Sequence, residues 1–203
     1  MVPDSTKNLP MMSLMTMEPG KTVEHQATFL TAGWPWVSWS RDGKRILFCA
    51  PEVQLALPLT RASKDEKLKE ALLQPALFAL TVETGEVKRL TKRMILYAVE
   101  SPDGKHILFV EWVGPDKTHV GVMNPDGSEV KVLDEGVKVE RDEIPGAVIV
   151  QPVWLSNTRV LYYKGEVWNR ADNLPMDSLF AIDIDGKNRE ALGAKIMKLL
   201  GAE

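Results

Sequence analysis

Apolar and polar positions alternate in short runs along the chain, and three of these runs recur at one fixed distance from a leucine. Each run holds four apolar or small residues, and a leucine follows 13 positions after its first residue, beyond a polar turn that contains glycine. Two apolar segments that flank such a turn are typical of a β-hairpin. The sequence therefore predicts one hairpin repeated three times, with runs at residues 77–80, 120–123 and 179–182 and leucines at Leu90, Leu133 and Leu192.

A second hairpin precedes each of these. Residues 36–48 and 97–109 share the pattern Ser-x-Asp-Gly-Lys-x-Ile-Leu-Phe, and residues 152–163 form an eroded third copy in which Asn157 and Thr158 occupy the turn. Asp-Gly and Asn tolerate the positive φ angles that tight turns demand. Each repeat is thus predicted to contain four short antiparallel strands.

Four such strands per repeat, with aromatic and turn signals at fixed places, are typical of a propeller blade. The repeat resembles the WD-like repeat of TolB-like β-propellers over residues 27–193. The resemblance implies an all-β fold, a partial β-propeller of about three four-stranded blades, and a noncatalytic module that binds a protein or peptide. It rests on two turn motifs and two hairpin ends, namely Trp39-Ser40-Arg41-Asp42-Gly43-Lys44, Ser101-Pro102-Asp103-Gly104-Lys105, Arg89-Leu90-Thr91 and Val132-Leu133-Asp134.

The chain is divided by this pattern into a leader, a propeller region and a tail. Residues 1–24 are predicted to be loosely ordered, residues 26–31 to form one isolated outer strand, and residues 194–203 to form a short helical tail. A capping-box pattern at residues 63–66, followed by apolar residues at helical spacing, predicts a short helix inserted in the first blade, serving as a lid, a docking element or local decoration. The propeller region is residues 25–193, with blades at residues 34–91, 94–135 and 147–193.

Three blades are too few to close a ring, since propellers have four to eight. Neither terminal blade looks polar: the first carries Trp34, Trp36 and Trp39, and the third carries residues 148–150 and Trp154. The exposed faces of the terminal blades could be covered in three ways. Two chains could pair about a twofold axis, the chain could be part of a longer propeller with additional blades, or the tails could fold over the faces. We therefore expect a homo-oligomer or missing blades.

Composition narrows the classes of partner. The chain has 203 residues, 44% of them hydrophobic, and a formal net charge of −3, which argues against nucleic acid. No apolar run is long enough to span a bilayer, so we expect no membrane span. Residues 1–20 lack the apolar stretch of a signal peptide, which indicates the cytoplasm, whereas the resemblance implies the periplasm, and the compartment stays open.

No catalytic signature is present, and we expect no enzymatic activity, no cofactor and no metal site. The chain lacks a nucleophile elbow, a phosphate-binding loop and a zinc-protease motif. The single cysteine, Cys49, follows an apolar run and is predicted to be a buried thiol. His106 and His119 are expected as solvated residues near the same end of the second blade's central hairpin.

Acidic and basic residues of the repeats are interpreted as structural. Asp42 and Asp103 are predicted turn formers, and Asp185 is assigned to a hairpin turn because its spacing from Asp183 departs from that of a calcium loop. Basic residues at positions 88, 89, 92 and 93 are expected on a solvated edge that discourages strand pairing.

Partner-binding residues are predicted among aromatic and arginine side chains of the loops, because these dominate binding energy at interfaces. The candidates are Trp112, Trp168 and Arg170. Packing of Trp112 within its strand pair and of Trp168 on its own blade is the alternative. A second function is implied by the same resemblance: a propeller fragment of an enzyme, either the accessory domain of a prolyl-oligopeptidase-like hydrolase or an oligosaccharide lyase.

Overall fold

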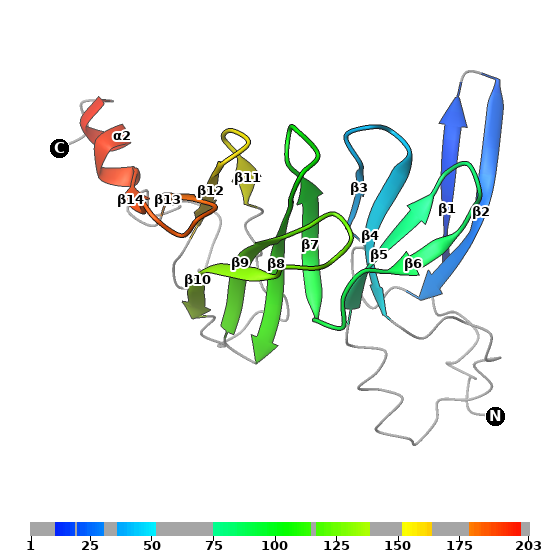
Figure 1. Ribbon diagram of the computed structural model, residues 1–203, viewed down its shortest axis with the longest axis horizontal. Helices are drawn as coiled ribbons and strands as arrows, with labels where there is room; N and C mark the ends of the chain where they lie inside the picture. The colour runs from blue at the N-terminus through cyan, green and yellow to red at the C-terminus, as the bar shows by residue number, and fades with distance from the viewer. Residues whose placement is uncertain are drawn as a thin grey trace, which may run out of the picture. The chain divides into compact units, whose positions relative to one another are not determined.

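A computed structural model describes residues 11–18, 20–30, 36–51, 75–114, 117–138, 152–163 and 179–199, and the account below is confined to them. Strands dominate these residues, in three four-stranded sheets and one two-stranded sheet (Figure 1). The all-β prediction, with about three four-stranded blades, is confirmed. The helix predicted within the first blade lies outside the described residues.

Each four-stranded sheet is a meander, because strands that follow one another in sequence are also neighbours in the sheet. This is the order that the paired hairpins of the sequence predict. The first sheet holds β3 (Val37–Trp39), β4 (Arg45–Pro51), β5 (Pro75–Thr81) and β6 (Val87–Arg89). The second holds β7 (Ile95–Glu100), β8 (Ile107–Gly114), β9 (Lys117–Met123) and β10 (Lys131–Lys138). The third holds β11 (Val153–Trp154), β12 (Arg159–Tyr163), β13 (Leu179–Asp183) and β14 (Glu190–Ala191), and the helix α2 (Gly193–Leu199) follows it.

The turn between β3 and β4 shows why the Ser-x-Asp-Gly pattern recurs. The Ser40 hydroxyl donates to Asp42 Oδ1 at 2.7 Å and accepts the backbone N–H of Arg45 at 2.8 Å. The backbone N–H of Lys44 donates to the same carboxylate at 3.0 Å. Gly43 has a φ of 70°, a conformation that favours glycine. The hydrogen bonds from Lys44 and then Ser40 lower the pKa of Asp42.

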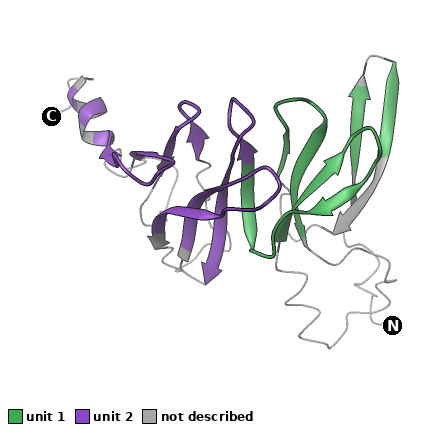
Figure 2. Cartoon of the chain, in the orientation of Figure 1, with its two compact units in different colours: residues 1–98 green, residues 99–203 purple. Residues whose placement is uncertain are grey.

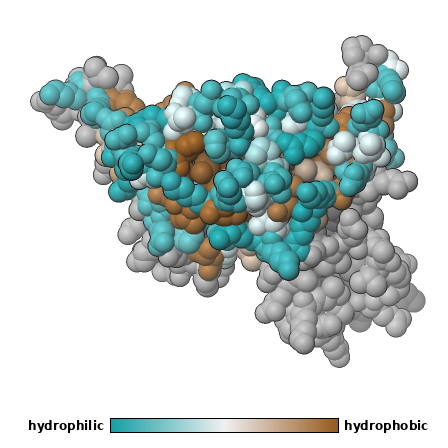
Figure 3. Space-filling model, viewed as in Figure 1, coloured by the Kyte–Doolittle hydropathy of each residue, from teal (hydrophilic) through white to brown (hydrophobic). Residues whose placement is uncertain are grey.

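The turn between β7 and β8 repeats this arrangement. Ser101 donates to Asp103 Oδ1 at 2.7 Å and accepts the N–H of His106 at 3.0 Å, while Gly104 has a φ of 69°. The prediction that both aspartates are turn formers is confirmed. Figure 3 colours the surface by hydropathy, and both hydrophilic and hydrophobic residues are visible on the face in view.

The chain divides into two compact units, residues 1–98 and 99–203, with the boundary inside β7 (Figure 2). In the first unit, alternate residues of β4 and β5 form one core, which Leu14 joins from a separate hairpin. In the second unit, one face of β8 and β9 packs on one face of β12 and β13. This second core consists of Leu108, Val120, Val122, Val160, Tyr162 and Ile182.

A two-stranded hairpin, β1 (Met11–Glu18) and β2 (Lys21–Leu30), occupies part of the predicted leader. The prediction of a loosely ordered leader at residues 1–24 was therefore wrong for the residues that β1 and β2 occupy. A strand is present at residues 26–30, as predicted, but it is the end of β2 and pairs with β1, so it is not isolated. Leu14 is buried whereas Met15 and Met17 are exposed, so the strand does alternate. Because methionines occupy the exposed face, both faces of the strand are apolar, and the alternation of apolar and polar residues expected of a strand is not visible in the sequence.

Candidate protein-binding face

One face of the first sheet continues the core of its unit but is only partly buried. Val37 pairs with Phe48 and Trp39 pairs with Ile46, so all four side chains lie on the same face. We call this surface, comprising these four residues with Phe78 and Leu80, the Trp39 face. Val37 and Trp39 retain 41% and 52% of their accessible surface, although the rest of the face is buried.

Hairpin β1–β2 buries the β4 and β5 part of the Trp39 face. Leu14 packs in one core with residues of β4 and β5, and β2 contacts β4. Among the described strands, β1 pairs with β2 alone. The exposed part of the Trp39 face lies on β3.

The third sheet has a tryptophan at the position that corresponds to Trp39. Trp154 pairs with Val160, the first residue of the run Val160-Leu161-Tyr162, just as Trp39 pairs with Ile46, the first residue of Ile46-Leu47-Phe48. Trp154 is partly buried against the core of the second unit, and its Nε1 donates to the Val99 carbonyl at 3.2 Å. In that unit an inner strand, β7, thus lies against this tryptophan.

The opposite face of β3 is fixed by hydrogen bonds to one carbonyl. Trp36 Nε1 and Ser38 Oγ both donate to the Ala98 oxygen, each at 2.9 Å. The Trp36 ring also lies 4.4 Å from the Tyr97 ring, measured between centroids. These contacts hold the backbone of β3 in place, so Val37 and Trp39 are presented from an anchored strand.

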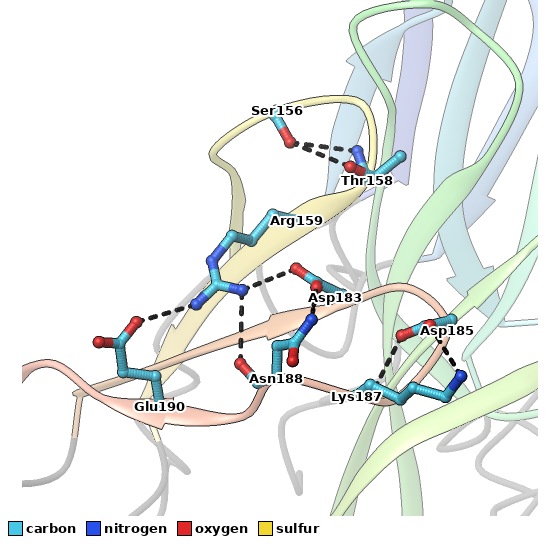
Figure 4. Close-up of polar contacts among 8 residues, drawn as sticks. All are labelled: Ser156, Thr158, Arg159, Asp183, Asp185, Lys187, Asn188 and Glu190. Atoms are coloured by element: carbon cyan, nitrogen blue, oxygen red, sulfur yellow. Dashed lines mark hydrogen bonds and ion pairs between the residues drawn. The ribbon is translucent and has the colours of Figure 1, made fainter.

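The third sheet presents a charged surface on the face away from its core. Arg159 donates to Asp183 Oδ1 at 2.7 Å and to Glu190 Oε2 at 3.0 Å, and Asn188 donates to Asp183 Oδ2 at 2.7 Å (Figure 4). Lys195 forms a further ion pair with Glu190. We call this surface the Arg159 face. Strand pairing places Arg159, Asp183 and Glu190 together on that side. Residues 148–150, on which the expectation of a third blade that is not polar partly rested, lie outside the described residues.

Asp185 belongs to a turn, as the sequence predicted. The backbone N–H of Lys187 donates to Asp185 Oδ1 at 2.8 Å, and Gly186 has a φ of 82°. Asp183 is bound by Arg159 and Asn188 instead of sharing a ligand set with Asp185. Among the described residues, no group of three or more histidine, cysteine or acidic side chains is placed to hold a metal ion.

Of the three predicted binding residues, Trp112 lies in the described part of the chain. Trp112 lies near the end of β8 opposite Thr118 and is partly buried. Trp168 and Arg170 lie outside the described residues. The sequence did single out Trp39 as an apolar residue of the first blade, but its exposure depends on what packs over β3, which alternation alone does not show.

The two histidines of the second blade lie at opposite ends of the hairpin formed by β8 and β9, so the expectation that they share one end was wrong. His106 precedes β8 and takes part in the Ser101 turn, whereas His119 lies opposite Glu111, with Nδ1 3.7 Å from Oε2. Cys49 is a buried free thiol, as predicted, and burial raises its pKa.

Comparison with solved structures identifies the fold. TolB from Acinetobacter baumannii matches with a TM-score of 0.51 and 17% identity, over 88% of this chain and 39% of that chain. This chain has a TolB-like β-propeller fold. Putative TolB from Agrobacterium tumefaciens matches this TolB-like chain with a TM-score of 0.51 and 18% identity, over 90% of this chain and 60% of that one.

The TolB-like fold is shared with enzymes of different kinds. An oligogalacturonate lyase in complex with manganese matches with a TM-score of 0.51 and 12% identity, over 85% of this chain and 39% of that chain. A prolyl endopeptidase matches with a TM-score of 0.52 and 12% identity, over 85% of this chain and 23% of that chain. No protein-family model matches the sequence, and no curated protein matches it. The likeness therefore defines architecture.

Proposed function

We propose that this chain is a noncatalytic β-propeller module that binds a protein or peptide partner. The observation that carries the proposal is the exposure of Val37 and Trp39 on a face that is otherwise part of a core. Exposed apolar surface that continues a core is characteristic of interaction sites, and tryptophan is enriched among residues that dominate binding energy.

The support beneath these two residues favours a binding role. Because Ala98 accepts hydrogen bonds from Trp36 and Ser38 on the opposite side of β3, the strand does not need to be ordered when a partner arrives. A surface that is already ordered loses less conformational entropy on association. Self-association that completes a propeller is a second form of the same proposal, in which the partner is another copy of the chain.

A propeller fragment of an enzyme is the alternative. It is supported by the shared architecture with the lyase and the prolyl endopeptidase, both at 12% identity. Metal-dependent cleavage of an oligosaccharide, or hydrolysis of peptides by a longer protein that contains this chain, would favour the enzyme over the binding module.

Val37 and Val153 provide a matched pair of variants for the test. Both are exposed strand valines, at 41% and 45%, but Val153 lies on the third sheet. A protein captured from the source cell by the immobilised chain would be purified and titrated against wild type, Val37→Asp and Val153→Asp. We expect Val37→Asp to weaken binding about tenfold or more and Val153→Asp to change it by less than about twofold. Equal affinity for all three proteins, or no saturable partner, would contradict the proposal.

A further inference from the structure

We propose that the partner presents an acidic peptide segment, which inserts an apolar side chain between Val23 of hairpin β1–β2 and Trp39 of the first sheet and places a carboxylate beside Lys44. This inference rests on the proposed function. It adds a second side to the binding site and specifies the chemistry of the ligand.

Val23 belongs to the face of the hairpin that packs on the first sheet. Strand pairing places Val23 opposite Thr16, which lies two residues along β1 from Leu14, so these three positions share one face. Met15 and Met17 lie on the opposite face and are exposed. Leu14 is buried in the core with β4 and β5, whereas Val23 retains 38% of its accessible surface. The hairpin therefore extends an apolar surface beyond the core that it shares with the sheet.

The first sheet extends its own apolar surface toward the same end of the unit. Strand β2 contacts β4, which is the neighbour of β3 in the sheet. The turn between β1 and β2 and the turn between β3 and β4 lie at the same end of the first unit (Figure 1). Val23 is the third residue of β2 and Trp39 is the last residue of β3, so each lies close to its turn. A side chain that enters at this end meets Val23 on one side and Trp39 on the other.

The turn that follows Trp39 carries an excess of positive charge. Residues 40–45 contain three basic residues and one acidic residue, which gives a formal charge of +2. Residues 101–106 form the same hydrogen-bonded turn with one lysine and one aspartate, so their formal charge is zero with histidine neutral. The turn itself therefore does not require the additional cations. Lys44 is exposed and extends the charge to the solvent beside the Trp39 face.

The opposite turn adds no comparable charge. Lys21 begins β2 and pairs with Glu18 of β1, so the two formal charges at this turn cancel. The cationic side of the site is thus the turn after Trp39, and a ligand that enters there meets an apolar centre and a basic rim. Interfaces with a desolvated apolar centre use charged residues at the rim for orientation and rate of association. A peptide segment that combines an apolar side chain with a nearby aspartate or glutamate matches both features.

A phage-displayed library of random linear peptides is the probe for this site. The library would be selected on the immobilised full chain, and one selected peptide would be synthesised with a dye label. Its affinity would be measured by fluorescence anisotropy at low and high salt. A second peptide, in which every aspartate and glutamate is replaced by the corresponding amide, tests the contribution of the carboxylates.

Two pairs of variants on matched positions test the two sides of the site. Val23→Asp and Met17→Asp alter opposite faces of the same hairpin, and both residues are exposed. We expect Val23→Asp to weaken binding about tenfold and Met17→Asp to change it by less than about twofold. Lys44→Glu and Lys105→Glu alter the same position of the two equivalent turns. We expect Lys44→Glu to weaken binding about fivefold or more at low salt and less at high salt, and Lys105→Glu to have little effect.

Thermal unfolding of each variant would establish that it is folded. Selected peptides without enrichment of acidic residues, equal binding of the amide peptide, or equal weakening within either pair of variants would overturn the inference. So would self-association of wild type that Val23→Asp abolishes while no peptide is selected, because the occupant would then be a second copy of the chain. If no peptide is selected but a captured protein is weakened by Val37→Asp, the inference fails and the proposed function stands. If neither ligand depends on Val37, both fail.

Discussion

The hydroxyl of Tyr162 donates a hydrogen bond of 2.6 Å to Asp134 and so joins two sheets of the second unit. Asp134 lies on β10 of the second sheet and Tyr162 on β12 of the third. Arg189 Nε lies 3.1 Å from the Tyr162 hydroxyl and 3.2 Å from Asp134 Oδ2, and its guanidinium sits 4.3 Å from the centre of the Phe180 ring. One buried phenol, one carboxylate and one guanidinium thus connect adjacent blades.

We expect Tyr162→Phe to lower the free energy of unfolding by about 1–3 kcal/mol, because a buried hydrogen bond to a charged group is lost while the ring remains. Urea unfolding at neutral pH would measure this. Asp134→Asn in the same background should have a smaller effect than in wild type, since the two residues share one interaction. Full additivity of the two substitutions would contradict this account.

The same tyrosine predicts a loss of stability at alkaline pH. Burial, and then the bond to Asp134, raise the pKa of Tyr162 above its ordinary value of 10. The unfolded chain therefore loses this proton first, and the stabilisation is complete below pH of about 10 and declines above it. Tyr162→Phe should reduce the alkaline decline in unfolding free energy. If the unfolding free energy of Tyr162→Phe declines with rising pH as steeply as that of wild type, the alkaline loss of stability arises from other groups.

Gly121 is required by the ring of Phe109. A Cβ atom at this position would overlap Phe109 Cζ and lie 2.6 Å from the backbone oxygen of Lys131. Since the Phe109 side chain is fully buried, we expect Gly121→Ala to destabilise the protein by about 1–3 kcal/mol or more in thermal or urea unfolding. Gly114→Ala is the matched control, because a methyl group there would meet no atom within 4 Å beyond its chain neighbours. Comparable losses in the two variants would refute the steric explanation.

The Arg159 face predicts an acid-dependent loss of stability. The pKa of Asp183 is lowered by hydrogen bonds from Asn188 and then Arg159, and that of Glu190 is lowered by Lys195 and, more weakly, by Arg159. Unfolded carboxyl groups with ordinary values of 3.8 and 4.5 take up protons first, so this stabilisation is present above those values and is lost as pH falls below them.

Arg159→Met should therefore reduce the difference in unfolding free energy between pH 7 and pH 3. Lys187→Met removes an exposed cation from the neighbouring turn and provides the control. A pH dependence that is the same in Arg159→Met as in wild type would show that the ion pairs on this face do not contribute.

Ser101 tests the recurrent turn. Its side chain is fully buried, and its hydroxyl bonds both Asp103 and the N–H of His106. We expect Ser101→Ala to cost about 1–3 kcal/mol of unfolding free energy, because the partly buried N–H of His106 loses its partner. Ser156→Ala, at the exposed position of the eroded copy, should cost less, and a larger loss there would contradict the assignment.

The sequence predicted the meander of each blade because turns such as Ser40 to Arg45 are determined by residues close together in the chain. It did not predict the Tyr162 to Asp134 bond, which joins residues 28 positions apart on different sheets. Nor did it predict hairpin β1–β2, where methionines on the exposed face concealed the alternation. The sequence also did not predict the exposure of Trp39. Trp154 holds the corresponding position in the third sheet but is partly buried, because a different strand lies against it.

The self-contained turn has a consequence for how such chains change length over evolutionary time. Ser40, Asp42 and Gly43 satisfy the turn's polar groups within a few residues, and the copy at Ser101 does so again. A gene segment that encodes one meander therefore also encodes all the residues that form its turn, and duplication copies both together. Selection on a newly copied blade then acts on the residues that contact adjacent blades, such as Trp154 and Tyr162. The turns within the blade need no further change.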